Sequence, residues 1–227
     1  MPVGVIADAV CVFLGGMAGS FLGNGMSERI KTNLNMIFGL SAAAIGIFSL
    51  TQMKNTPVVI LALIIGTLIG LLINISDGVR SGVRKVTKGS CSEDLITIIV
   101  LFCVSATGYY GALTEGMGAG SSILFTKAIL DFFTGMIIAC SQGKIVAFLC
   151  IPQFVIHLVL FLLATLIYPL CTPSMIGDFS ACGGIIMIAT GCRMLNLKMF
   201  PTADMIPAMI IVMPLSWLWT SFIAPLL

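Results

Sequence analysis

Long apolar stretches alternate with short polar joins along the whole chain. A window of about 19 residues separates apolar segments at 3–23, 34–52, 57–75, 95–112, 121–140, 145–168, 178–195 and 203–224. Each is close to the length of about 20 residues with which an α-helix crosses a bilayer. The one longer polar stretch, Ser76–Asp94, carries several basic residues and is expected to be a loop. The pattern predicts an all-α, polytopic transmembrane helix bundle with about eight spans.

The composition points to the same class of protein. Hydrophobic residues make up 59% of the 227 residues, charged residues make up 9%, and the mean hydropathy is +1.14. So little polar surface excludes a soluble globular protein, and we expect a single integral membrane domain over residues 1–227 with the lipid bilayer as its main partner. The N-terminus lacks the basic region and cleavage site of a signal peptide, so the first segment is expected to be retained.

The basic residues predict the orientation in the membrane. Short cytoplasmic loops are enriched in Lys and Arg. With eight spans, one side receives nine basic residues, which are Arg29, Lys31, Arg80, Arg84, Lys85, Lys88, Lys144, Arg193 and Lys198. The other side receives only Lys54, and Lys127 lies inside a span. If 121–140 did not cross, the split would fall to six against four, so the asymmetry favours eight spans with both termini outside the cytoplasm.

Two charges lie near the middle of the segment 121–140, and they are the main functional clue. Lys127 and Asp131 are four residues apart, so they lie one above the other on a helix and can pair. Thr134 continues the same stripe. Each charge costs roughly 2.5 to 3.5 kcal/mol at the centre of a membrane helix, so such residues normally face a bundle interior or a wet cavity. We expect an amphipathic span whose polar stripe faces the protein.

Four other polar residues are candidates for the same site. Asp8 in the first segment is either a buried functional carboxylate or a solvated interfacial one. Glu115 lies among glycines, either at broken helix ends that bind an ion or polar solute, or in a flexible external turn. Gln153 and His157 are four residues apart in the segment 145–168, where hydrogen-bonded packing is favoured over a proton relay. Their spacing predicts that they share one helix face.

Two further acids are expected to be structural. Asp178 opens the segment 178–195, and Asp204 precedes the apolar part of the last segment. An acid at a helix N-terminus accepts hydrogen bonds from free amides and suits the helix dipole. We therefore predict that each is a helix cap.

Several classes of function lack support in the sequence. There is no nucleophile elbow, H-E-x-x-H, P-loop or Rossmann glycine pattern, so we expect no enzyme activity and no cofactor. The eight cysteines lie mostly in apolar stretches without a C-x-x-C pair, which favours packing roles over metal ligation. The net charge of only +2, with the bases in loops, gives no support for a nucleic-acid partner.

Small residues suggest how the helices pack. Gly15, Gly19 and Gly23 recur every four residues, as do Gly66 and Gly70, which lets helix backbones approach closely, within one chain or in a homo-oligomer. The stretch LSAAAIGIFSL at 40–50 resembles FSACGGIIMIA at 179–189. An inverted repeat of the first three and last three segments around the central two is one explanation, and chance similarity is the other.

The central and C-terminal blocks carry a family resemblance. They include TGYYGALTEGM, then SSILFTKAILDFFTGMIIACSQG, and later DFSACGGIIMIATGCRMLNLKMFPTADMIPAMIIVMP. The sequence resembles the bacterial YqgA/YdfK-like membrane protein family, a domain of unknown function numbered 554, essentially end to end. The resemblance implies a bacterial inner-membrane protein, with transport as the expected activity and no assigned substrate.

The leading hypothesis is a secondary transporter or ion-conducting protein for a small polar solute or monovalent cation. Its path would be lined by the polar face of the segment 121–140, with Asp131 binding the cation or proton and Lys127 acting as the competing internal partner. The alternative is a non-transporting scaffold or assembly protein, in which Lys127 and Asp131 form a structural ion pair.

Overall fold

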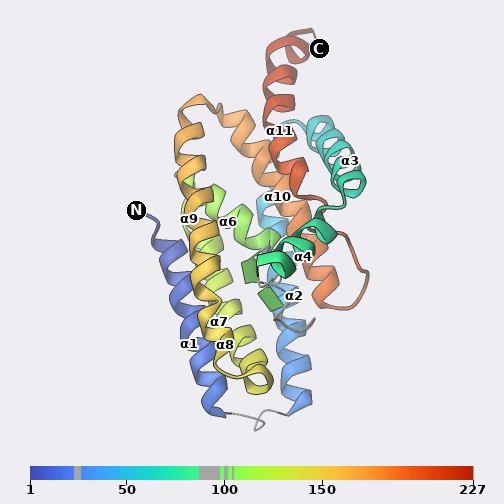
Figure 1. Ribbon diagram of the computed structural model, residues 1–227. Coiled ribbons are helices and arrows are strands. Elements are labelled where there is room, and N and C mark those ends of the chain that lie inside the picture. Colours follow the sequence, from blue (N-terminus) through green and yellow to red (C-terminus); the bar gives the residue numbers. More distant parts are fainter. Residues whose placement is uncertain (23–26, 87–97, 100–101, 104, 227) are drawn as a thin grey trace. The chain divides into compact units, whose positions relative to one another are not determined.

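Every regular element in the described part of the chain is helical (Figure 1). The computed structural model describes residues 1–22, 27–86, 98–99, 102–103 and 105–226. The helices are α1 (Val3–Leu22), α2 (Glu28–Leu50), α3 (Thr56–Ile73), α4 (Ile75–Val86), α6 (Ala106–Gly116), α7 (Ser122–Gln142), α8 (Ile145–Phe148), α9 (Cys150–Ile167), α10 (Pro173–Met194) and α11 (Ile206–Leu218). Short helical turns follow α9 and α11, at Tyr168–Leu170, Trp219–Ile223 and Ala224–Leu226. The predicted all-α class is confirmed.

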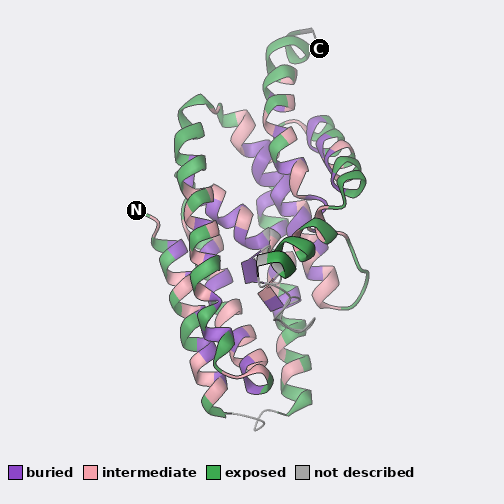
Figure 2. Cartoon of the chain, in the orientation of Figure 1, coloured by how far each residue is buried: buried purple, intermediate pink, exposed green. Residues whose placement is uncertain are grey.

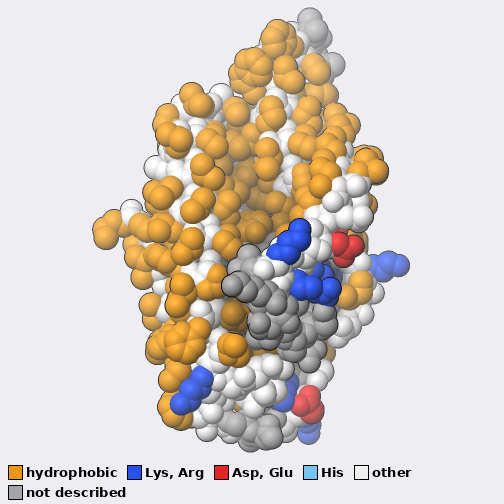
Figure 3. Space-filling model, viewed as in Figure 1, with side chains coloured by type: hydrophobic (Ala, Val, Ile, Leu, Met, Phe, Trp, Pro, Cys, Tyr) orange, Lys and Arg blue, Asp and Glu red, His pale blue; other side chains and the backbone are white. Residues whose placement is uncertain are grey.

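Seven helical stretches in the described residues are long and apolar enough to span a membrane. They correspond to seven of the predicted segments, with α8 and α9 together forming the stretch Ile145–Leu170. The remaining segment, 95–112, lies partly outside the described residues, so a count of eight spans stays a prediction. Large apolar side chains are exposed on these helices, such as Leu72 at 83% and Leu170 at 78%. Hydrophobic atoms cover much of the face in Figure 3, as lipid contact requires.

The chain divides into two compact units. The first contains residues 1–38 and 80–168, and therefore α1, α6, α7, α8 and α9. The second contains residues 39–79 and 169–227, and therefore α3, α10 and α11. In the second unit α10 is the most enclosed helix, with 67% of its membrane window buried against at most 33% in the other six candidate spans (Figure 2).

Glycines set the closest helix contacts in the first unit. A Cβ atom on Gly15 would lie 2.1 Å from the carbonyl oxygen of Phe132, and one on Gly19 would lie 2.1 Å from that of Met136. No side chain larger than hydrogen fits at such distances, so α1 and α7 touch backbone to backbone over two successive turns. The predicted packing role of these glycines is confirmed, while Gly23 lies outside the described residues.

Glycines also allow close backbone contacts at two places in the second unit. A Cβ atom on Gly70 of α3 would lie 1.9 Å from the carbonyl oxygen of Asp204. Between α2 and α10 the contacts are reciprocal, because Gly39 meets the Gly191 carbonyl and Gly191 meets that of Gly39. Gly46 and Gly184 meet in the same way, one pair of turns further along. The two helices that suggested the repeat thus cross antiparallel, and the inverted repeat itself stays a prediction.

Two acids cap helices other than the ones predicted. Asp178 does not open α10, which begins at Pro173 behind the capping side chain of Thr172. Its buried carboxylate accepts hydrogen bonds from the backbone N–H groups of Lys54 and Asn55 at 2.9 and 2.7 Å, at the start of α3. The local prediction was wrong because a carboxylate one and a half turns inside a helix can still reach the free amides of a neighbouring helix.

Asp204 acts in the same way at α4. Its carboxylate accepts from the backbone N–H of Ser76 at 3.0 Å and from the Ser76 hydroxyl at 2.6 Å. The helix α4 itself replaces the loop predicted at 76–94 over its first part, up to Val86. Arg84 and Lys85 lie in the last turn of α4, where basic residues suit a helix C-terminus.

Candidate functional site

Lys127 of α7 is buried in the first unit, with 2% of the side chain exposed. Its ammonium donates to Asp131 Oδ2 on the same helix, the pairing that the four-residue spacing predicted. It also donates to Asp8 Oδ2 at 3.0 Å, and Asp8 comes from α1. A single lysine therefore joins two carboxylates from two helices.

Asp8 is fully buried, so of its two interpretations the interfacial, solvated one is wrong. The reason is that the Asp8 side chain is directed at α7 and α9, where Lys127, Gln153 and His157 surround its carboxylate. Besides Lys127, the carboxylate accepts from Gln153 Nε2 at 2.7 Å, and His157 Nδ1 lies 3.2 Å from the same Oδ2 atom. The Oδ2 atom of Asp8 thus faces the Lys127 ammonium, the Gln153 amide and the His157 imidazole.

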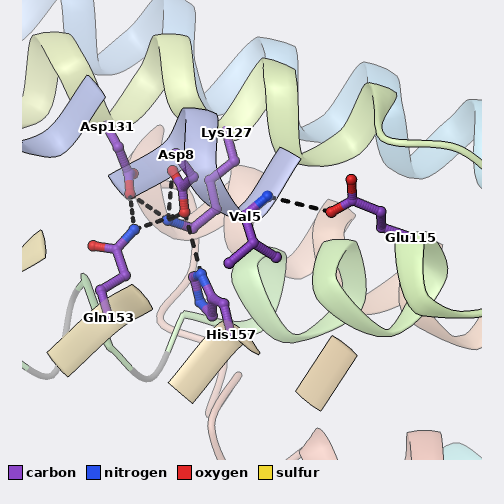
Figure 4. Close-up of polar contacts among 7 residues, drawn as sticks. All are labelled: Val5, Asp8, Glu115, Lys127, Asp131, Gln153 and His157. Carbon is purple, nitrogen blue, oxygen red and sulfur yellow. Dashed lines mark hydrogen bonds and ion pairs between the residues drawn. The ribbon is translucent and has the colours of Figure 1, made fainter. Parts of the chain in front are cut away.

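Gln153 and His157 lie one turn apart on the same face of α9, as their spacing predicted, and both are fully buried. Gln153 Nε2 also donates to Asp131 Oδ2 at 3.1 Å. We call the five residues brought together by α1, α7 and α9 the polar cluster. Its members are Asp8, Lys127, Asp131, Gln153 and His157 (Figure 4).

The charges of the polar cluster do not balance. Two carboxylates face one ammonium, so the five side chains sum to −1 when the His157 imidazole is neutral. Buried ions are costly unless they are paired and hydrogen-bonded, and at membrane depth they normally mark a functional site. The cluster is therefore suited to take up one further positive charge.

Exposure differs sharply within the polar cluster. The Asp131 side chain keeps 15% of its surface exposed, whereas the other four side chains are at most 2% exposed. Three buried atoms, Gln153 Oε1 and both ring nitrogens of His157, have no hydrogen-bond partner among the described residues. Asp131 is thus the member of the polar cluster that keeps exposed surface.

The start of α6 lies next to the cluster and contacts His157. Phe102 and Cys103 are helical, Ser105 is extended with φ −72° and ψ 126°, and α6 begins at Ala106. A Cβ atom on Gly108, in the first turn of α6, would lie 2.3 Å from His157 Nε2. The imidazole therefore packs against the N-terminal turn of α6 because residue 108 lacks a side chain. Sequence reasoning did not single out this glycine, although the small residues of SATG mark a close approach.

Glu115 does not join the polar cluster, and the flexible external turn predicted for it is wrong because it lies in α6, while its predicted role in binding an ion or solute stays a prediction. It is 7% exposed near the end of α6, and its carboxylate accepts from the backbone N–H groups of Gly4 and Val5 at 2.7 and 3.2 Å. The Ser121 hydroxyl donates to it at 2.6 Å. Its acceptors are directed at the free amides of α1, so it caps that helix (Figure 4).

Thr134 lies on α7 one turn beyond Asp131 and is half-buried. Its hydroxyl makes no hydrogen bond to the polar cluster in the described part of the chain. The structure therefore brings together five of the seven predicted site residues, and it leaves Thr134 and Glu115 apart from them.

Comparison with known proteins places the chain among membrane proteins. Residues 3–217 match the family described as "Protein of unknown function (DUF554)". The chain is 43% identical over 235 residues to "Uncharacterized protein YqgA" of Escherichia coli (strain K12), covering 99% of this chain and 100% of that protein. It is 26% identical over 212 residues to "Uncharacterized membrane protein YdfK" of Bacillus subtilis (strain 168), covering 92% and 93%. No solved structure matches the chain.

Proposed function

We propose that this chain, which belongs to the DUF554 family, is a secondary transporter or ion-conducting protein of the bacterial inner membrane. Its cargo would be a small polar solute or a monovalent cation. The observation that carries the proposal is the polar cluster, in which two carboxylates and one lysine are held inside apolar membrane helices. Charges at this depth are costly, and they are typical of ion and proton pathways.

The geometry supports a mechanism in which occupancy competes with an internal ion pair. In the present arrangement Lys127 bridges Asp8 and Asp131. A proton or monovalent cation at Asp131 would neutralise that carboxylate and weaken its attraction for the lysine. Lys127 would keep its partner Asp8, so binding would change the contacts between α7 and its neighbours. A ligand that binds the two arrangements differently shifts the equilibrium between them.

Flux measurements on the purified protein test the proposal. Proteoliposomes with an imposed monovalent-cation or pH gradient are expected to show flux with the wild-type chain. The variants Lys127→Ala and Asp131→Asn are expected to lose it. Ile129→Val is the matched control, because Ile129 lies between them on α7 with 58% of its surface exposed and outside the cluster. Flux equal to wild type in both cluster variants would remove the proposed role.

The burial of the polar cluster favours a second candidate function, that of a scaffold or assembly protein. Four of the five cluster side chains are at most 2% exposed, and buried ion pairs can serve to fix one packing arrangement. In that case replacement of Lys127 and Asp131 by Met and Leu, combined with Asp8→Asn so that no buried charge loses its partner, is tolerated in folding and in biological function. A transporter with the same triple replacement still folds but loses flux.

A further inference from the structure

Asp8 offers no open position for an incoming ion. Its Oδ2 atom already receives Lys127 and Gln153 and faces His157, and its side chain has no exposed surface. Lys127 also donates to the second carboxylate oxygen, Asp8 Oδ1, at 3.4 Å. Asp8 therefore acts as the fixed anion of the polar cluster.

His157 is not placed to carry the extra positive charge. Its Nδ1 atom faces Asp8, and its buried Nε2 atom has no hydrogen-bond partner. Nε2 packs against Gly108 in the first turn of α6. The Lys127 Cε atom is also close to Gly108, because a Cβ placed on this glycine would lie 3.0 Å from it. A helix N-terminus carries partial positive charge, so an imidazolium N–H there would face a helix dipole and an ammonium of its own sign. A neutral imidazole avoids both.

The surroundings of Asp131 differ from those of Asp8. Asp131 Oδ2 accepts from Lys127 and Gln153, whereas no described residue donates to Oδ1. It is the member of the cluster with exposed surface, at 15% of the side chain. The titratable groups that face it are Lys127 on α7, Asp8 and Cys11 on α1, and Cys103, while His157 faces Asp8 from α9.

These surroundings suit a proton better than a metal cation. A metal cation, monovalent ones included, binds to several oxygen lone pairs, about six for hard cations such as Ca²⁺ and Mg²⁺, whereas the groups that contact Asp131 Oδ2 are an ammonium and an amide NH₂, which are donors. In the described part of the chain no group of three or more His, Cys, Asp or Glu residues is arranged to hold a metal ion. A proton needs only one free oxygen lone pair.

We infer that the coupling ion is a proton and that Asp131 is its carrier, an inference that rests on the proposed transport function. A hydronium ion from the exposed side donates its proton to Asp131 Oδ1, an O–H bond forms, and water leaves. The carboxyl becomes neutral, and the charge of the cluster changes from −1 to 0. Lys127 then remains as the partner of Asp8 alone, so each proton taken up converts a bridged lysine into a one-to-one ion pair.

Infrared difference spectroscopy on the full-length protein in liposomes tests the carrier directly. Lowering the pH is expected to produce a protonated-carboxyl C=O band from a weakly hydrated site, which is missing in Asp131→Asn and present in Glu28→Gln. Glu28 is the matched control because its side chain is 86% exposed and lies outside the cluster. Asp131→Glu, which keeps a carboxyl group, is expected to retain a shifted band and guards against a folding defect in the amide variant.

The outcomes separate this inference from the proposed function. A band that survives in Asp131→Asn overturns the inference, as does a band that NaCl or KCl suppresses relative to choline chloride at equal ionic strength. Cation flux without the band also overturns it and leaves a metal-ion transporter. A band at Asp131 without flux under any gradient overturns the transport function, and with it the coupling role of this proton site.

Discussion

Lys127 is the one positive charge between two buried carboxylates, and this makes its side chain the most sensitive position in the polar cluster. Asp8 and Asp131 both pair with it, and among the described residues Gln153 alone supplies further hydrogen bonds to both of them. Removing one partner of a buried ion pair leaves an uncompensated charge. The effect of each substitution can therefore be ranked by the charge that it leaves behind.

Lys127→Met is expected to lower the free energy of unfolding by about 3–5 kcal/mol, because two carboxylates then face each other without a cation. Adding Asp131→Asn restores the original cluster charge of −1 and is expected to recover part of this loss. Thermal unfolding in detergent measures both effects against Ile129→Val. Equal stability of the single variant and the wild type would contradict the buried pairing.

Glu115 shows how much a single remote cap contributes. Glu115→Ala removes the acceptor for two free amides of α1 and is expected to cost about 1–2 kcal/mol, while Glu115→Gln keeps one acceptor oxygen and is expected to cost less. The exposed Glu28, paired with Lys31 at 2.7 Å, is the comparison. Glu28→Gln is expected to change stability by less than about 0.5 kcal/mol.

At the scale of helices, the packing of α1 on α7 decides where the polar cluster forms. Asp8 lies two turns before Gly15 on α1, and the contact of Gly15 with Phe132 fixes the register of α1 against the Lys127–Asp131 turn. Helix association in a bilayer depends on close packing of small residues. The register, and with it the Asp8–Lys127 contact, should fail when this contact is widened.

Gly15→Ala places a methyl group 2.1 Å from the Phe132 carbonyl oxygen, so the two backbones must separate. We expect a loss of about 1–3 kcal/mol in stability together with reduced flux. Gly135→Ala is the control on the same helix pair, because its nearest neighbour would be 3.5 Å away, an ordinary contact. Similar unfolding temperatures for the two variants would show that the backbone contact does not set the register.

The sequence was most informative where the chemistry is local. Spacing of four residues predicted the Lys127–Asp131 pair and the shared face of Gln153 and His157, because both follow from the turn of one helix. It could not predict Asp8 as the second partner of Lys127, since that contact spans 119 residues and depends on how α1 and α7 pack. The prediction that Asp178 caps its own helix was wrong for the same reason, because the amides that it accepts from lie at the start of another helix.

For the molecule as a whole, the distribution of basic residues predicts the direction in which the chain crosses the bilayer. Lys54 is the one basic residue expected outside, and eight spans place both termini outside the cytoplasm. This arrangement requires the segment 95–112 to cross, and that segment lies partly beyond the described residues. Orientation is therefore the prediction that most directly tests the number of spans.

Epitope tags at the two termini are expected to be cleaved by protease added to intact spheroplasts. A tag inserted in the stretch 76–94 is expected to be protected until the membrane is permeabilised. The internal tag is the matched control, because it reports from the side that receives most of the basic residues. Protection of one terminal tag would mean an odd number of crossings and would exclude eight.

The carbonyl contacts at Gly15 and Gly19 also constrain any working cycle. Backbone atoms cannot rotate aside as side chains do, and two such contacts one turn apart prevent both sliding and rolling of α1 along α7. In the proposed transport cycle we therefore expect α1 and α7 to move together as one rigid body, so that the carboxylate of Asp8 moves with the Lys127 ammonium that it binds.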